Sequence, residues 1–159
     1  MAGEKASRIQ REIRQERPFR SRRHECLISL LRTADVVTRR LTVVVEPHGI
    51  TLQQYNVLRI LRGAGADGLP TLEIALRMIE HAPGITRLLD RLEHKKLVRR
   101  QRCGRDRRRV LCSITPEGLE MLGRLETPMA GADEGWAGRL SPRDVAQLVR
   151  ILDTVRTSA

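Results

Sequence analysis

The sequence predicts a mainly α-helical fold with one small β-hairpin. Three features of the chain support this class. Apolar residues recur at three- and four-residue steps near both ends, two short amphipathic segments follow one another in the middle, and a β-branched run comes soon after them. The 159 residues, of which 40% are hydrophobic, suit one compact domain with an extension.

A long helix is expected from about residue 24 to residue 45. Its apolar residues fall on one stripe, which consists of Leu27, Leu30, Leu31, Ala34, Val37, Leu41 and Val44. Pro47 and Gly49 then stop the helix. Residues 1–22 are expected to form a basic N-terminal extension in front of it, because arginines there outnumber the few glutamates.

The next helix is expected to begin at Thr51. Thr51 and Gln54 have the spacing of a capping box, in which each of the two residues satisfies a backbone N–H of the other. Tyr55, Leu58 and Leu61 are predicted to form the buried face of this helix. The loop that follows is marked by Gly63, Gly65, Gly68 and Pro70.

Residues 71–94 have the pattern of a helix-turn-helix. Thr71 is expected to cap the first short helix. The residues predicted to face inward from it are Leu72, Ala75, Leu76 and Ile79. After a break at residues 81–83, the same spacing recurs at Ile85, Leu88, Leu89 and Leu92. The second helix then has a polar outer face, made of Thr86, Arg87, Asp90, Arg91 and His94.

A β-hairpin is predicted directly after this second helix. Leu97 and Val98 lead into the basic run RRQRCGRDRRR, and the β-branched and apolar residues 110–114 follow it. The tip of the hairpin is expected at residues 104–108. A hairpin in this position is typical of a wing, which places arginines beside the minor groove of DNA. The pattern as a whole therefore predicts a winged helix-turn-helix.

Two further helices are expected at the C-terminal end. Thr115, Pro116 and Glu117 are mutually consistent start signals for the first, whose apolar residues are Leu119, Leu122, Leu125 and Met129. A linker that contains Gly131, Gly135 and Gly138 is expected to separate it from the last helix. The last helix opens at Ser141 and carries Val145, Leu148, Ile151, Leu152 and Val155 on one side. The stripes at both ends are covered either by the chain's own core or by a second copy.

The charge of the chain points to a polyanionic partner. Its net charge is +11, and residues 95–109 hold nine lysines and arginines against the single acid Asp106. Such a local excess favours a surface for phosphates over a solvated loop, although both interpretations stay open. The basic extension is either an arm on DNA or a charged helix. Aromatic residues make up only 2% of the chain, which argues against single-strand or RNA stacking platforms.

These motifs resemble those of the MarR family of regulators, over about residues 24–157. The most specific matches are the run ITRLLDRLEHKKLVRR, the Asp106 and Arg108 pair of the wing, and Ile114, Thr115 and Gly118 at the next helix. The resemblance implies a homodimer whose first and last helices intertwine, so that two winged domains bind the half-sites of a pseudopalindromic operator in double-stranded DNA. It implies dimerisation helices at about 23–46 and 116–157, a DNA-binding part at about 51–115, and a MarR-type domain over 23–158.

The resemblance also suggests which residues bind DNA. Arg108 would enter the minor groove, Asp106 would brace the wing, and Thr86, Arg87 and Arg91 would face the major groove. The full expected set is Thr71, Gly84, Thr86, Arg87, Arg91, Arg102, Arg105, Asp106, Arg107 and Arg108. Pro83 and Gly84 depart from the small hydroxyl residues that are usual in the family at the start of this helix. Lys96 stands where a glycine is common, and a left-handed lysine would cost about 1 kcal/mol.

Regulation by a small effector, often an aromatic acid, is implied by the family but is not identified by any residue here. Cys26 resembles the position of a reactive cysteine in the peroxide-sensing branch, without the tyrosines which that branch uses. Arg22 and Arg23 could activate this thiol, but the sequence favours a buried, inert Cys26 over a redox switch. A general polyanion binder remains the alternative to a sequence-specific regulator.

The remaining classes of function are disfavoured. The four histidines are scattered, the three cysteines form no CxxC pair, and no phosphate-binding glycine loop or nucleophile elbow is present. The sequence thus predicts no metal site, no cofactor and no enzyme. The longest apolar runs fall short of a membrane span and the N-terminus lacks a signal core, so the cytoplasm is the expected compartment.

Overall fold

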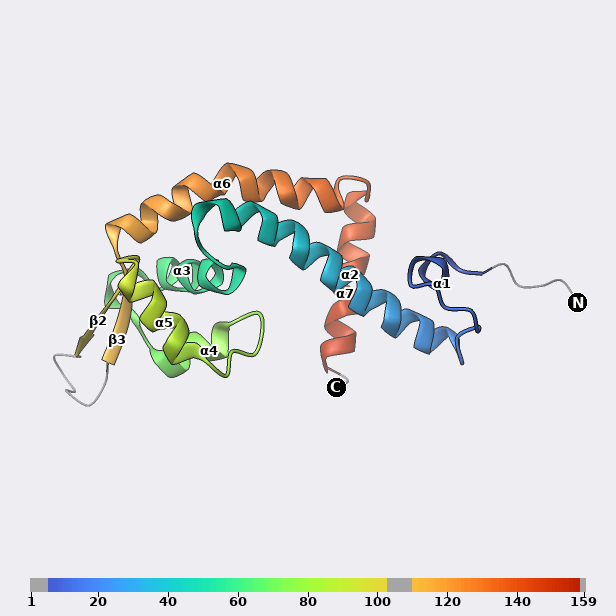
Figure 1. Cartoon of the computed structure of the whole chain (residues 1–159), viewed down its shortest axis with the longest axis horizontal. Helices are drawn as coiled ribbons and strands as arrows, with labels where there is room; N and C mark the ends of the chain where they lie inside the picture. The colour runs from blue at the N-terminus through green and yellow to red at the C-terminus, as the bar shows by residue number, and fades with distance from the viewer. Residues whose placement is uncertain (1–5, 103–109, 158–159) are drawn as a thin grey trace, which may run out of the picture. The chain divides into compact units, whose positions relative to one another are not determined.

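The computed structural model describes residues 6–102 and 110–157 (Figure 1). The chain divides into two compact units, Met1–Arg40 and Leu41–Ala159, and each is described by itself. The domain boundaries expected from the sequence at residues 22 and 158 remain a prediction. Among the described residues, no helix is long and apolar enough to cross a membrane.

The N-terminal unit contains a short helix inside the basic extension. Helix α1 (Arg8–Glu12) begins at Ser7, whose side chain accepts a hydrogen bond from the backbone N–H of Gln10. Ile9 is buried in this unit. Hydrogen bonds from Ser7 and Arg22 lower the pKa of Glu25, which ties the extension to the following helix. The extension is therefore partly helical, and a role as an arm on DNA stays a prediction.

Helix α2 (Arg22–Val45) confirms the long helix expected at residues 24–45. Its apolar stripe is only partly covered, since Leu27 is 53% and Leu31 is 59% exposed. A 3₁₀ turn (η1, Glu46–His48) follows, and Gly49 takes the left-handed conformation at φ 71°. Glycine suits this position because a Cβ atom disfavours positive φ.

Helix α3 (Leu52–Ala64) begins with the predicted capping box. The Thr51 hydroxyl accepts from the Gln54 backbone N–H at 3.2 Å, and the Thr51 backbone N–H donates to the Gln54 side chain at 3.1 Å. Leu58 and Leu61 are fully buried as expected, and Val57 joins them. Tyr55 is half-buried and packs against the edge of the core.

The capping box yields a first prediction. Thr51→Ala removes the hydroxyl that accepts from the Gln54 backbone N–H but keeps the Thr51 backbone N–H, so we expect the free energy of unfolding to fall by about 1 kcal/mol. Thr127→Ala is a matched control, because Thr127 lies exposed within a helix and is not a cap. Urea unfolding followed by circular dichroism measures both variants. Equal stability of Thr51→Ala and the wild type would contradict the prediction.

A three-stranded antiparallel sheet packs against α3. Its order is β1-β3-β2, with β1 (Leu69–Pro70), β2 (Val98–Arg102) and β3 (Val110–Ile114). Strands β2 and β3 are the two arms of the predicted hairpin, and Arg100 is opposite Cys112. Strand β1 was not expected, because a two-residue strand leaves no periodic pattern in the sequence.

Helix α4 (Thr71–Arg77) corrects two expectations. Pro70 is the N-cap residue and no side chain caps the helix, so the predicted cap at Thr71 is wrong. The predicted inward face is also wrong, since Leu72, Leu76 and Ile79 are 70%, 72% and 85% exposed while Ile74 is fully buried. Two apolar stripes fit this short segment almost equally well. The attachment of β1 to β3 just before the helix selects the stripe that contains Ile74.

Three longer helices complete the chain: α5 (Ile85–His94), α6 (Pro116–Ala137) and α7 (Pro142–Thr157). Helix α6 starts at the predicted cap, where the Thr115 hydroxyl accepts from the Gly118 backbone N–H at 3.1 Å. The linker expected at Gly131 and Gly135 is wrong, because α6 continues through both and through Pro128. Each glycine costs a helix only about 1 kcal/mol, which the packing of Leu122, Leu125 and Met129 offsets.

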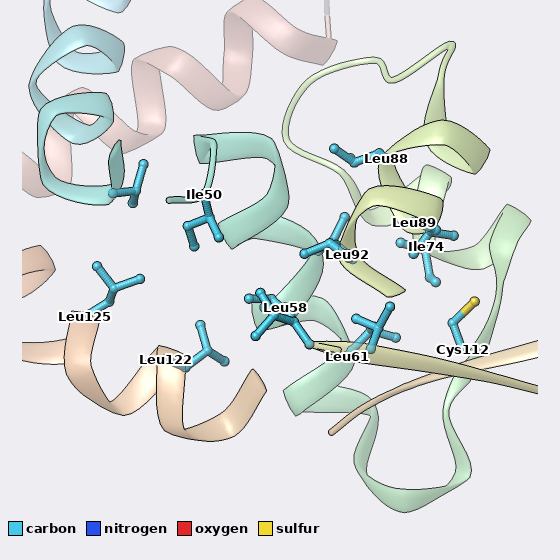
Figure 2. Packing of buried hydrophobic residues seen from close by; sticks show 14 of the residues in the cluster. Ile50, Leu58, Leu61, Ile74, Leu88, Leu89, Leu92, Cys112, Leu122 and Leu125 are labelled. Carbon is cyan, nitrogen blue, oxygen red and sulfur yellow. The ribbon is translucent and has the colours of Figure 1, made fainter. Parts of the chain in front are cut away.

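The main core lies in the C-terminal unit and is shared by most of its elements. Figure 2 shows Leu58 of α3 between Leu92 of α5 and Leu122 of α6, with Leu61 of α3 on the side toward Cys112. All four of these leucines are at most 2% exposed. Burying such side chains contributes roughly 1.5–3 kcal/mol each, so the orientation of α5 is held by the core.

Candidate nucleic-acid interface

Helix α5 separates its side chains into a buried and an exposed face. Leu89 and Leu92 are fully buried and Leu88 is 9% exposed, which confirms three of the four residues predicted to face inward, while Ile85 is half-buried. The predicted outer face is confirmed as exposed and consists of Thr86, Arg87, Asp90, Arg91 and His94. The chain thus places a polar, mostly basic helix surface at the outside of the helix-turn-helix.

No side chain of the described residues caps the N-terminal end of α5. Gly84 is its N-cap residue and provides no side-chain cap. A shallow hollow at this end is lined by Pro83, Gly84, Thr86 and Arg87. The first backbone N–H groups of a helix and an adjacent guanidinium both favour anions, so this end of α5 is electrostatically suited to a phosphate group.

The end of α5 has the conformation expected of a glycine. Lys96 adopts φ 59°, in the left-handed region, at the position where the sequence showed a departure from the family pattern. Its strain is offset by hydrogen bonds, because its N–H donates to the Glu93 carbonyl at 2.8 Å and its carbonyl accepts from the Thr115 hydroxyl at 2.7 Å. The turn between α5 and β2 is therefore tight despite the lysine.

Arg100 links β2 to α5. Its guanidinium Nη1 donates to Asp90 Oδ1 at 2.5 Å and its Nη2 donates to the Thr86 carbonyl at 3.1 Å. Its backbone N–H donates to Glu93 Oε1 at 3.1 Å. Partial burial disfavours the charge on Arg100, but the hydrogen bond and the charge of Asp90 raise its pKa. Sequence analysis did not single out this residue, because nothing in a basic run distinguishes one arginine from its neighbours.

The strands that follow α5 carry further basic residues. Arg99 and Arg102 of β2 are exposed, and Arg99 Nε donates to the Ser113 hydroxyl at 3.0 Å across the hairpin. Four residues of the expected DNA-binding set lie outside the described residues, namely Arg105, Asp106, Arg107 and Arg108. Within the described residues, the candidate interface therefore comprises helix α5 and strands β2 and β3.

Two other residues singled out from the sequence lie elsewhere. Thr71 is half-buried at the start of α4, where its side chain hydrogen-bonds to Cys112. Burial raises the pKa of the Cys112 thiol, which keeps it protonated at neutral pH. Cys26 is exposed on α2, so the expectation of a buried thiol is wrong for this chain. Cys26 lies on a part of α2 where neighbouring apolar residues such as Leu27 are also exposed. The spacing of apolar residues in the sequence does not reveal which part of a helix stays uncovered.

No cluster of three or more His, Cys, Asp or Glu residues that could hold a metal ion occurs within residues 6–102 and 110–157. The candidate interface consists of hydrogen-bond donors and guanidinium groups, together with the carboxylates of Asp90 and Glu93, which Arg100 contacts. This composition suits contact with phosphates and base edges.

Comparisons with known proteins agree with this architecture. The profile of the MarR family matches residues 50–110. The crystal structure of a MarR transcription factor from Planctomyces limnophilus is 36% identical, with a TM-score of 0.66, over 86% of this chain and 99% of that one. The homoprotocatechuate degradative operon repressor of Escherichia coli is 28% identical over 82% of this chain and 87% of its own length.

The fold also occurs in a protein with DNA bound. The structure of an S. aureus MepR–DNA complex has a TM-score of 0.75 at 24% identity, and the match covers 82% of this chain and 96% of that one. The chain spans 64% of the length of a relative from Thauera aromatica, named as a putative transcriptional regulatory protein, with 28% identity over 69% of this chain. The similar proteins are thus regulators of transcription.

Proposed function

Because this chain belongs to the MarR family of transcriptional regulators, we propose that it is a homodimeric repressor that binds a pseudopalindromic operator in double-stranded DNA. A small ligand or a stress signal would release the operator. DNA as the partner also favours the cytoplasm as the compartment. The observation that carries the proposal is the outer face of α5, where Thr86, Arg87 and Arg91 are exposed on a helix held by three buried leucines.

The geometry suits an approach to two grooves. Helix α5 is long enough, at ten residues, to lie in a major groove, and β2 and β3 run on from its end as a wing. In this proposal Arg87 and Arg91 contact bases or phosphates in the major groove. Arg102 of the strand, together with Arg105, Arg107 and Arg108 of the wing tip, contacts the minor groove and its phosphates, and Asp106 braces the wing.

The dimer is supported by apolar surface near both ends of the chain. Leu27 and Leu31 of α2 are exposed, and so are Val149, Ile151 and Val155 of α7, each by 48–59%. Exposed apolar side chains that gather on one helix commonly mark a protein interface, and each of the two units carries such a helix. A second copy that covers these helices would bring two α5 helices to one operator, as a pseudopalindrome requires.

We propose only the chemical class of the signal that releases the operator. One curated relative is named as the repressor of a degradative operon, which supports a repressor that responds to a small molecule. Tyr55 packs beside the core, and Cζ of Arg59 lies 6.0 Å from the centroid of its ring, which supports a structural role for Tyr55 over an effector contact. An aromatic acid or an oxidant acting at Cys26 are the two kinds of signal to compare.

The test is selection of genomic DNA fragments by the purified protein at near-physiological salt. The wild type should enrich a pseudopalindromic site. Arg87→Ala should weaken binding to that site by about 10–100-fold, because a dimer loses the contact in both half-sites. Arg108→Ala should weaken it as well, which tests the wing.

Arg124→Ala is the matched control for charge. Arg124 is an exposed arginine that pairs with Glu120 within α6, so its loss should leave affinity for the selected site unchanged. Recovery of no common motif, together with equal competition by RNA, would replace the regulator by a general polyanion binder.

A further inference from the structure

The contacts of Arg100 span most of the recognition helix. Through Thr86, Asp90 and Glu93 they reach three successive turns of α5, whose own orientation is held by the core, so they set the orientation of β2 relative to that helix. The Arg100 side chain is 23% exposed, and it donates to Asp90 and the Thr86 carbonyl of α5 and also hydrogen-bonds to Cys112 of β3. Strand β2 and helix α5 are therefore joined by more than the short turn between them.

We propose that Arg100 is a positioning residue for DNA binding, which holds the wing at a set orientation to α5 and neutralises the carboxylates of Asp90 and Glu93. The proposal rests on the proposed function, since it assumes that α5 and the wing bind one duplex together. A planar guanidinium suits this task because its fork can donate to a carboxylate and to a carbonyl at the same time.

Neutralisation matters because Asp90 lies on the face of α5 that carries Arg87 and Arg91. The Asp90 side chain is 52% exposed and that of Glu93 is 42% exposed. An unpaired carboxylate on this face would repel the phosphates that the arginines attract. Arg100 lies 2.5 Å from Asp90 and 3.6 Å from Glu93, so it cancels this repulsion while holding the strand in place.

The first test needs no DNA. Hydrogen exchange of the full-length protein compares the wild type with Arg100→Gln, and with Arg99→Gln as the matched control. Arg99 is the adjacent arginine on β2, but it donates across the hairpin to Ser113. We expect amides of α5 and β2 to exchange at least about tenfold faster in Arg100→Gln, with α3 and α6 unchanged. Exchange that is equal in the two variants would overturn the proposal.

A second variant separates positioning from folding. Arg100→Lys keeps the charge but lacks the fork, so it should fold like the wild type and exchange at intermediate rates in α5 and β2. Wild-type exchange in Arg100→Lys, with wild-type affinity for DNA, would show that charge alone suffices and would overturn the positioning role. This comparison remains informative if Arg100→Gln fails to fold.

The last test is a double-mutant cycle on DNA affinity, with the fragment selected by the wild-type protein. Arg100→Gln should reduce affinity at least about tenfold, and in the Asp90→Asn background the same change should cost only about threefold. Costs that add would mean that Arg100 contacts DNA directly, which would overturn the proposal. Failure of the wild type to select any fragment would instead contradict the proposed function and leave the exchange test in force.

Discussion

Gly118→Ala is expected to abolish stable folding. A Cβ atom at Gly118 would lie 2.3 Å from the Leu97 backbone carbonyl and 2.7 Å from Ile114 Cγ1. The carbonyl cannot move without disturbing the turn that leads into β2, and Gly118 also donates its backbone N–H to Thr115. We expect a loss of more than about 3 kcal/mol, a large part of the stability of a typical domain. Thermal unfolding by circular dichroism measures it.

Gly123→Ala is the control in the same helix. An added Cβ at Gly123 meets no atom within 4 Å, and this residue is exposed. Alanine there should stabilise the protein by about 0.5–1 kcal/mol, because glycine loses more backbone entropy in a helix. A wild-type melting curve for Gly118→Ala would show that α6 and the sheet do not approach as closely as described.

Leu31→Glu is expected to convert the proposed dimer into monomers and to remove specific DNA binding. Leu31 is 59% exposed on the apolar stripe of α2, and a second copy would have to bury the introduced carboxylate without a partner. Two half-sites bound by one dimer act at a high effective concentration, so we expect affinity for the operator to fall at least about 100-fold. Analytical ultracentrifugation and DNA titration measure the two effects.

Thr33→Glu tests whether charge alone explains the result. Thr33 is exposed on the opposite side of α2 from Leu31, so the same negative charge should leave the dimer intact. A wild-type sedimentation coefficient for Leu31→Glu would place the dimer interface elsewhere. Monomers that still bind the operator with wild-type affinity would argue against two linked half-sites.

Helix boundaries and faces that are determined by nearby residues were predicted correctly from the sequence. The capping boundary at Thr51, the start of α6 at Thr115 and the inward leucines of α5 all depend on residues within a few positions of one another. The exposed face of α5 follows from the same pattern, because buried leucines at positions 88, 89 and 92 leave the intervening polar residues outside. The exposure of this polar face could therefore be predicted from the sequence, whereas its contact with DNA stays a prediction.

Elements that depend on distant partners were not predicted. The rotation of α4 is set by β1 and β3, which lie about 40 residues apart in the sequence, and not by its own leucines. Helix α6 continues past Gly131 because Leu122, Leu125 and Met129 pack on the core. The exposure of Cys26 on α2, and that of Leu72 and Leu76 on α4, likewise depend on which distant elements pack against each helix.

The sequence by itself determined the class of fold, the helix-turn-helix with its basic strands, and the family to which the chain belongs. Those properties are encoded in periodicity, capping residues and charge, which act over a few residues. Only the tertiary structure decided that Arg100 joins β2 to Thr86 and Asp90 of α5. A charged side chain finds its partner through space, so its role depends on the packing that brings the two elements together.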